Sequence, residues 1–206
     1  MWGGANTEND IINSLEIYDI DTQIWTVGLA GGTPRKFHST ATLGTKLYFF
    51  GGINQFGEDL NTVDIYDTVT AEWERGVSGG NPRSFHKSLI EGGRVYLLAG
   101  HTTEVTSNTD IFIPEVSSDT LSSSIWSEGE RGGKKRKDHA SLSYASNIYH
   151  WGGTDENDEI SNTLDIFMTN SDNWYRQDNG DDLEGGRHRK SHQGFVHQEK
   201  LYFHGG

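Results

Sequence analysis

A five-fold repeat of one short motif constrains this chain of 206 residues more than any other feature. In each copy an aromatic-rich run ends in a pair of glycines, or in Ala-Gly in the third copy. The second glycine falls at positions 4, 52, 100, 153 and 206, which gives periods of 48, 48, 53 and 53 residues. Periods of this length are typical of repeat architectures such as propellers. The copies are MWGG (1–4), KLYFFGG (46–52), RVYLLAG (94–100), NIYHWGG (147–153) and KLYFHGG (200–206).

Two further features recur after each of the first four glycine pairs. An aromatic residue lies 14 positions beyond the second glycine in three copies and 12 beyond it in the third. A tryptophan follows that residue by 7 positions, or by 14 in the copy with a serine-rich insertion at Ser117–Ser124. This insertion and an acidic one near Asp178–Asp182 explain the longer periods, because loops absorb insertions at little cost. The aromatic residues are Tyr18, Tyr66, Phe112 and Phe167, and the tryptophans are Trp25, Trp73, Trp126 and Trp174.

Each repeat divides into four short runs that favour β-branched and aromatic residues. In one repeat these runs are 38–43, 46–50, 62–67 and 71–75, and the segment VDIYD within them alternates with the period of a half-buried strand. No segment offers a capped stretch with helical periodicity. Four strands in each repeat of about 50 residues predict an all-β chain with about four blades' worth of four-stranded antiparallel sheets, arranged as a β-propeller.

A second constant block, Gly-Gly-x-x-Arg-x-x-His, follows each tryptophan. It reads GGTPRKFH, GGNPRSFH, GGKKRKDH and GGRHRKSH, and the next glycine pair begins 13 positions after each histidine. Because the block precedes the first strand of each repeat, we expect its four copies to gather on one face of the propeller. The candidate binding residues are therefore Arg35, His38, Arg83, His86, Arg136, His139, Arg189 and His192.

These motifs resemble kelch repeats across the whole chain. A glycine pair would end the second strand, an aromatic residue followed by Asp would lie in the third, and Trp in the fourth. Pro-Arg-x-x-His at Pro34–His38 and Pro82–His86 is similar to one kelch subtype, whereas Ala99, Ile113 and Met168 depart from the pattern. The resemblance implies a kelch propeller with the first strand of each blade innermost. The predicted divisions are a partial repeat 1–30, repeats 31–78, 79–131 and 132–184, and a partial repeat 185–206.

Closure of the propeller has two interpretations. The chain forms a closed four-bladed ring if the C-terminal strands 192–198 and 200–204 join the N-terminal pair in one blade, which leaves no open sheet edge. Alternatively, the chain is part of a larger propeller, as the start of the sequence in the middle of a motif suggests.

The composition is consistent with a propeller and excludes several other classes. The 26 glycines are nearly twice the usual share, and the low apolar content of 33% is offset by 11% aromatic residues. We expect the core to be aromatic, since a buried Trp removes about 150–250 Å² from water. The absence of cysteine excludes a disulfide scaffold, and no apolar stretch is long enough to span a membrane. The predicted core residues are Trp25, Trp73, Trp126 and Trp174 with Tyr48, Tyr96, Tyr149 and Tyr202.

Charge is segregated along the chain. A net charge of −13 argues against binding of nucleic acid or of an anionic membrane, yet 11 of the 17 basic residues lie in or beside the Arg-x-x-His blocks. On one interpretation, the arginines and histidines bind carbonyls of neighbouring loops and tie the blades together. On the other, they form a mouth that grips carboxylate or phosphate. Acidic residues in the loops after the glycine pairs would form a rim on the same face and pair with basic neighbours.

Two candidate motifs, one for catalysis and one for metal binding, are not supported when the repeats are compared. Gly76–Gly80 matches Gly-x-Ser-x-Gly, but that motif needs a following helix, and Ala30 occupies the serine position in the preceding copy. The four repeated histidines could hold a metal ion, but four neighbouring arginines would oppose a cation. We therefore expect no metal, no cofactor and no enzymatic activity.

These patterns together favour a protein–protein interaction module that binds a partner through loops on one propeller face. The expected partner is another protein, with an acidic segment as the favoured ligand, and neither nucleic acid nor a membrane is expected. The alternative is a kelch-type enzyme or carbohydrate-binding protein with a site at the central axis. An enzyme would place groups with shifted pKa values in one asymmetric pocket. A cytoplasmic location is expected, because the N-terminus lacks the features of a signal peptide.

Overall fold

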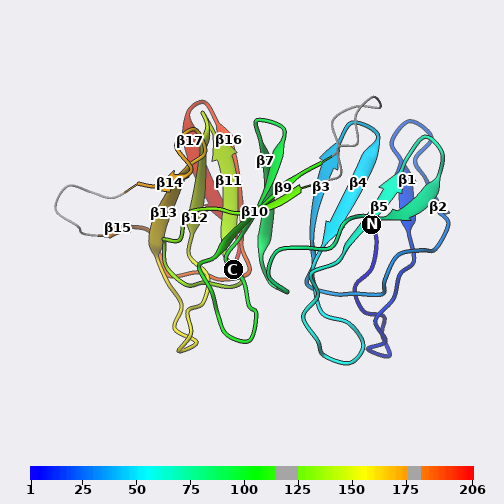
Figure 1. The fold of residues 1–206 in the computed structure, drawn as a ribbon, viewed down its shortest axis with the longest axis horizontal. Coiled ribbons are helices and arrows are strands. Elements are labelled where there is room, and N and C mark those ends of the chain that lie inside the picture. Colours follow the sequence, from blue (N-terminus) through cyan, green and yellow to red (C-terminus); the bar gives the residue numbers. More distant parts are fainter. Residues whose placement is uncertain (115–124, 176–181) are drawn as a thin grey trace. The chain divides into compact units, whose positions relative to one another are not determined.

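Every regular element in the described residues is a β-strand. The computed structural model describes residues 1–114, 125–175 and 182–206 (Figure 1). The chain divides into two compact units, Met1–Ser84 and Phe85–Gly206. The predicted insertion at 117–124 and most of the one near 178–182 lie outside the described residues. The predicted all-β fold is confirmed.

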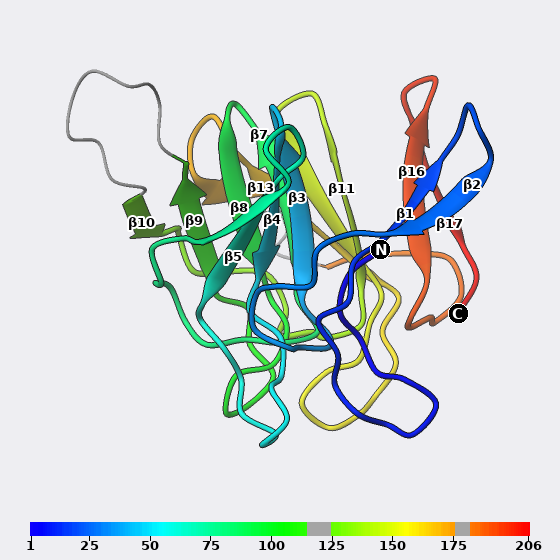
Figure 2. The same cartoon turned by 90° about the vertical axis from the view of Figure 1, so that its right-hand side faces the viewer.

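The first unit contains a two-stranded and a four-stranded antiparallel sheet, which Figure 2 shows from the side. The register of the two-stranded sheet sets Tyr18 opposite Trp25, as Tyr66 lies opposite Trp73 in the larger sheet. The small sheet therefore repeats the third and fourth strands of the large one. The strands of the small sheet are β1 (Glu16–Asp19) and β2 (Ile24–Val27), and those of the large sheet, in spatial order, are β3 (Ser39–Leu43), β4 (Lys46–Phe50), β5 (Val63–Asp67) and β6 (Glu72–Arg75).

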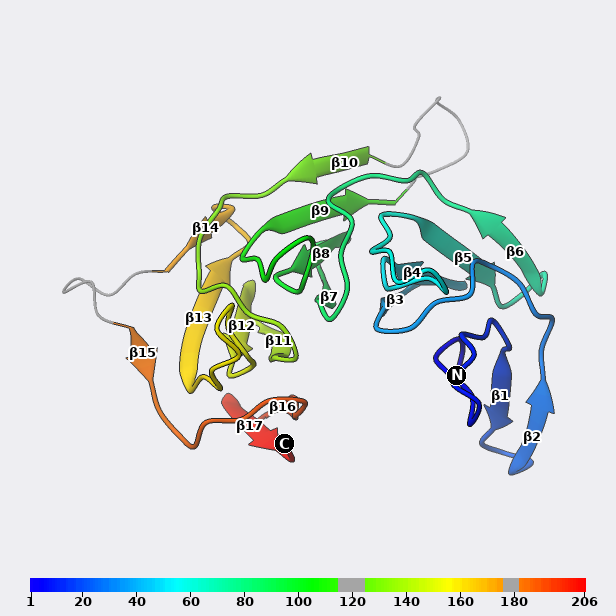
Figure 3. The same ribbon diagram turned by 90° about the horizontal axis from the view of Figure 1, so that it is seen from below.

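The second unit contains three antiparallel sheets, whose strands follow chain order (Figure 3). The first consists of β7 (Lys87–Glu91), β8 (Arg94–Leu98), β9 (Thr109–Ile113) and β10 (Ile125–Glu128). The second consists of β11 (Ala140–Tyr144), β12 (Asn147–Trp151), β13 (Thr163–Met168), β14 (Asn173–Trp174) and β15 (Leu183–Glu184). Because β14 and β15 pair with opposite ends of β13, they make up a fourth strand in two pieces. The third consists of β16 (Gln193–His197) and β17 (Lys200–His204).

The sheets of the second unit are arranged as successive blades. Strand β11 lies beside both β7 and β16, so the first strands of three consecutive sheets are neighbours (Figure 1). First strands meet in this way in propellers, where four-stranded sheets are repeated about an axis. The chain therefore contains several four-stranded antiparallel sheets of the kelch blade type, and the two interpretations of closure stay predictions.

The glycine pairs adopt left-handed backbone conformations. Gly51 and Gly52 have φ values of 59° and 91°, which favour glycine. A Cβ atom on Gly52 would also lie 2.7 Å from the carbonyl oxygen of Lys36. Ala99 replaces the first glycine of its pair and keeps the left-handed conformation, with φ at 56°. The pairs thus let the chain turn out of the second strand against the loop that precedes the first.

The core is aromatic, as predicted, but its members differ in part. In the second unit Tyr96, Phe167 and Trp174 are buried in one cluster with aliphatic neighbours. Trp25 is an exception: its side chain is 60% exposed, because both faces of the β1–β2 sheet are largely exposed. Tyr202 on β17 is also exposed, because it lies on the exposed face of a strand whose other face is half-buried. The core prediction is wrong for these two residues.

Candidate functional site

Arg35 lies inside the first unit and not at a surface. Its side chain is fully buried and joins the entry to β3 with the ends of β4 and β5. One terminal nitrogen donates to the carbonyl oxygens of Gly51 (2.6 Å) and Thr62 (3.1 Å). The other donates to Thr62 Oγ1 (2.9 Å) and to the carboxylate of Asp64. Burial lowers the pKa of Arg35, whereas Asp64 acts in the opposite direction.

Arg136 repeats these contacts in the second unit. It donates to the carbonyl oxygens of Gly152 (2.7 Å) and Thr163 (3.1 Å), to Thr163 Oγ1 (2.9 Å) and to Asp165 (2.6 Å). The Asp165 carboxylate also accepts from the backbone N–H of Lys134 at 2.7 Å. The same four-bond pattern in both units makes the arginine a clamp on its own blade. The arginine therefore binds carbonyls, as the structural interpretation expected, but these side-chain bonds stay within one blade and do not tie it to the next.

The remaining predicted site residues lie in two different environments. Arg83 is buried like Arg35, whereas Arg189 is half-buried and donates to the carbonyl oxygen of Gly205. The histidines of the block lie at the start of each first strand, where His86, His139 and His192 are buried and His38 is half-buried. Burial lowers the pKa of His38 to about 4 and that of His139 well below its usual value. His38 and His139 are thus held neutral, and the binding role of the eight residues stays a prediction.

Two lysines beside Arg136 in the second unit are paired with carboxylates of neighbouring loops. Lys135 contacts Glu156 at 2.6 Å and Glu104 at 3.7 Å, and Lys137 contacts Asp158 at 2.9 Å. These are the predicted inter-loop ion pairs, and their charges partly cancel. In the first unit Lys36 has no carboxylate partner among the described residues, and its Nζ lies 5.4 Å from the centre of the Phe37 ring.

The loops of the first unit enclose a cavity of about 670 Å³ beside Phe37. The loops after the first two glycine pairs are held by the side-chain oxygens of Asn6 and Asn54, each of which accepts two backbone N–H groups of its own loop. Such turns fix the loop before a ligand arrives. The cavity is lined by Asn9, Asp10, Ile11, Lys36, Phe37, Ile53, Asn54, Gln55 and Gly57.

Phe37 has a conformation that its residue type disfavours. Its φ is 58°, and the equivalent residues Phe85, Asp138 and Ser191 have φ values of 54°, 55° and 52°. The turn before the first strand therefore demands a left-handed residue in every repeat, where Gly, Asn or Asp costs least. Phe37 nevertheless stands there with 46% of its surface exposed. Sequence analysis missed this position, although the variable residue before an invariant histidine was visible in the alignment of the repeats.

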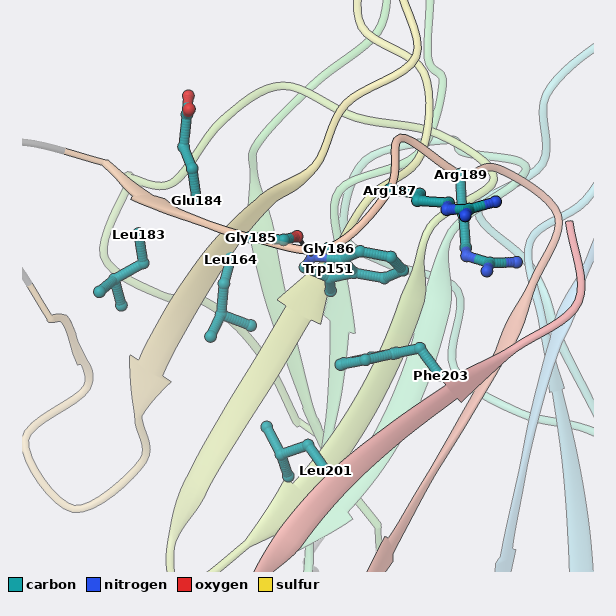
Figure 4. Close-up of a pocket in the computed structure, with 10 residues that line it drawn as sticks. All are labelled: Trp151, Leu164, Leu183, Glu184, Gly185, Gly186, Arg187, Arg189, Leu201 and Phe203. Carbon is teal, nitrogen blue, oxygen red and sulfur yellow. Dashed lines mark hydrogen bonds between the residues drawn. The ribbon is translucent and has the colours of Figure 1, made fainter.

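A second cavity, of about 610 Å³, lies in the second unit between β15 and β17 (Figure 4). Trp151 and Phe203 form an aromatic wall, with Gly185 beside Trp151 and Arg189 at one end. Trp151 Nε1 donates to the carbonyl oxygen of Gly185 at 3.1 Å, which fixes the indole ring. This groove was not predicted, because the residue before the glycine pair varies between the repeats (Trp2, Phe50, Leu98, Trp151 and His204) and the repeat pattern gives it no role.

The described residues show neither a metal centre nor a membrane helix. No three His, Asp or Glu side chains in residues 1–114, 125–175 and 182–206 come together as metal ligands would. No helix in these ranges is long and apolar enough to cross a membrane. The predicted lack of metal and cofactor stays a prediction.

Four-stranded sheets in chain order, with a glycine pair after the second strand and a tryptophan on the fourth, define a kelch-repeat domain. The chain matches the family model of the KLHDC2/KLHL20/DRC7 Kelch-repeats domain over residues 1–206, and it belongs to that family. The search of curated proteins finds no match. The predicted kelch resemblance is confirmed.

Proposed function

We propose that this kelch domain is a protein-interaction module without catalysis of its own, and that a partner binds the loop cavity beside Phe37. Membership of the kelch family supports this function, because such domains commonly mediate protein binding. The observation that carries the proposal is Phe37 itself, a large exposed aromatic residue at a turn position where the backbone favours Gly, Asn or Asp. Exposed aromatic residues beside preformed pockets are typical anchors of protein interfaces.

The side chains that line the cavity indicate which kind of partner would bind there. Phe37, Ile11 and Ile53 line the cavity and offer apolar contact, and Phe56, between the lining residues Gln55 and Gly57, is 76% exposed. Lys36 supplies a positive charge without an internal carboxylate partner among the described residues. The best ligand is therefore a protein segment that inserts an apolar side chain and places a carboxylate near Lys36. The proposed partner is therefore still acidic, as the sequence analysis expected, but its carboxylate would contact Lys36 and not the buried arginines.

Catalysis is not favoured by the titratable groups. Of the described histidines with the most strongly lowered pKa values, His139 and His150 are buried and His38 is half-buried, and burial is the first cause for each. His38 and His139 belong to the repeated block, and His150 donates or accepts a bond with Ser141 at 2.7 Å inside the β11–β12 pair. A general acid or base must reach a substrate, and buried groups of this kind do not.

The test is selection of a peptide display library on the wild-type chain, followed by binding of the selected peptides to Phe37→Asn. Asn tolerates the left-handed conformation, so this variant should be at least as stable as wild type. We expect its affinity for the selected peptides to fall about tenfold or more, as loss of a central aromatic anchor does. Val69→Ser is the matched control, since Val69 is 75% exposed in the turn between β5 and β6. Equal loss in both variants, or none in Phe37→Asn, would contradict the proposed site.

A further inference from the structure

One lysine of the second unit lies at a position that other sheets fill with small, buried residues. Lys87 is the first residue after the repeated histidine and begins β7. The equivalent residues on β3 and β11, in the other sheets that have a third and a fourth strand, are Ser39 and Ala140. Ser39 is 8% exposed and Ala140 is 1% exposed, whereas the longer side chain of Lys87 is half-buried. Because lysine is rarely buried unless it is paired, Lys87 is a residue that its position does not favour.

Lys87 lies on the face of β7 that is turned toward the next sheet of the second unit. Leu89, two residues further along the same face, lies opposite Tyr96 of β8. The ring of Tyr96 lies 5.8 Å from that of Phe167 on β13, so this face packs against the sheet that contains β11. Strands β7 and β11 are also neighbours in space. The side that Lys87 faces therefore lies within the second unit, between two sheets that each have a first, second, third and fourth strand.

The Lys87 amine has neither a hydrogen bond nor an ion pair among the described residues. Burial lowers the pKa of Lys87, and the carboxylate of Asp138 acts in the opposite direction without a hydrogen bond. Burial is also the main cause of the lowered pKa values of His139 and His192, and the charge of Lys87 lowers both further. The amine therefore lies near the entries to β11 and β16. His139 is fully buried there, and neither of its ring nitrogens has a hydrogen-bond partner in the described part of the chain.

These surroundings favour the uncharged amine over the ammonium ion. Burial without a contacting carboxylate makes the charged form costly, and lysines in such environments are activated as nucleophiles. An acyl group on the amine would remove the charge and add a carbonyl oxygen. That oxygen would offer an acceptor to an imidazole N–H such as that of His139, which has no other partner among the described residues.

We propose that Lys87 is an acylation site that reacts with an acyl thioester. The amine nitrogen attacks the thioester carbonyl, a nitrogen–carbon bond forms as the carbon–sulfur bond breaks, and the thiol leaves with the proton that the amine loses. The product is a neutral amide at a position where the equivalent residues Ser39 and Ala140 are also uncharged. The site lies in the second unit and is independent of the cavity beside Phe37.

The experiment measures acetylation of the full chain by acetyl-coenzyme A at neutral pH, with each lysine followed by peptide mass spectrometry. The matched control is Lys46, which begins β4, is 37% exposed and donates to Glu74 at 2.5 Å. This hydrogen bond raises the pKa of Lys46, so less of its amine is uncharged. We expect Lys87 to be acetylated about threefold faster than Lys46 or more, although it is not the more exposed of the two. In guanidinium chloride the two rates should be equal, because unfolding removes the difference in environment.

An acetylation rate of Lys87 equal to or below that of Lys46 in the folded chain would overturn the proposal. A difference that persists in guanidinium chloride would overturn it too, because the local sequence and not the fold would then be its cause.

Two variants provide a second measurement that does not depend on the acyl donor. Lys87→Gln is neutral, as the acylated lysine is, whereas Lys87→Arg stays charged. The urea unfolding midpoint of Lys87→Gln should therefore equal or exceed that of wild type, and the midpoint of Lys87→Arg should lie below that of Lys87→Gln. Equal midpoints of the two variants, or the reverse order, would also overturn the proposal.

Discussion

The arginine clamps have a measurable consequence that distinguishes a structural from a binding role. We consider the replacement of Arg136 by methionine, which keeps the aliphatic part of the side chain and removes the guanidinium. The change deletes four hydrogen bonds of 2.6–3.1 Å and leaves the Asp165 carboxylate, 10% exposed, without its cation. Removal of one partner from a buried ion pair costs about 3–5 kcal/mol of stability. With a urea m value of about 2 kcal/mol/M, the unfolding midpoint should fall by about 2 M.

The assay is urea unfolding followed by tryptophan fluorescence, with a surface pair as the matched control. Arg131 contacts Glu128 at 2.7 Å, but its side chain is 73% exposed. Exposed pairs contribute about 0–1 kcal/mol, so Arg131→Met should shift the midpoint by less than about 0.5 M. The double variant Arg136→Met/Asp165→Leu should recover part of the loss, because it leaves no unpaired charge. Equal midpoints for Arg136→Met and Arg131→Met would refute the clamp and would favour a binding role for the arginine.

Three further results are expected from the geometry. Burial lowers the pKa of His38 to about 4 and that of His139 well below its usual value, so the unfolded chain binds more protons below about pH 6.5. Stability should be complete above that pH and fall as the pH drops toward 4, and His139→Leu should flatten this dependence in urea titrations at several pH values. The two-residue turn Gln198-Glu199 has φ values of 46° and 60°, which Asn-Gly tolerates better. Replacement of this turn by Asn-Gly should raise the free energy of unfolding by about 1 kcal/mol. A free energy of unfolding below that of wild type would contradict the turn assignment. Gly31→Ala should destabilise the first unit by about 1–3 kcal/mol through its clash with Trp73, whereas Gly185→Ala should have no such effect in the same thermal melts.

The repeat allowed most of the fold to be predicted, because each part of it is a local requirement. The alternation of VDIYD and the aromatic residues opposite each other on β5 and β6 are enough to predict strands and their pairing. The second glycine of each pair is constant because a Cβ atom there, as at Gly52, would clash with the carbonyl of Lys36, whereas the first position tolerates Ala99. The exposure of Trp25 was not predictable in this way. A motif indicates which strand carries a residue, but burial depends on whether another sheet packs against that strand.

The roles of the site residues were less predictable than their positions. The spacing of Arg35 and Asp64 is the same as that of Arg136 and Asp165, 29 residues, so the pairs could have been proposed from the sequence. Their burial could not, since a guanidinium gripping an internal aspartate and one gripping a ligand have the same sequence pattern. The groove beside Trp151 could not be predicted either, since it depends on how β15 and β17 are placed in three dimensions.

Comparison of the repeats distinguishes residues that stabilise the fold from residues that are available for recognition in the segment before each first strand. The arginine of the block is invariant, and where its bonds are described it binds its own blade, as at Arg35 and Arg136. The residue before the histidine keeps one backbone conformation in all four copies, yet its side chain changes from Phe to Asp to Ser. A side chain that the fold needs should be constant, and one that serves recognition need not be, because a specific partner contacts the blades unequally. Phe37 and Phe85 are the two copies in which a large side chain opposes the backbone preference, and of these Phe37 is the exposed one and borders the loop cavity of the first unit. For this reason we place recognition at the variable position and stability at the invariant arginine.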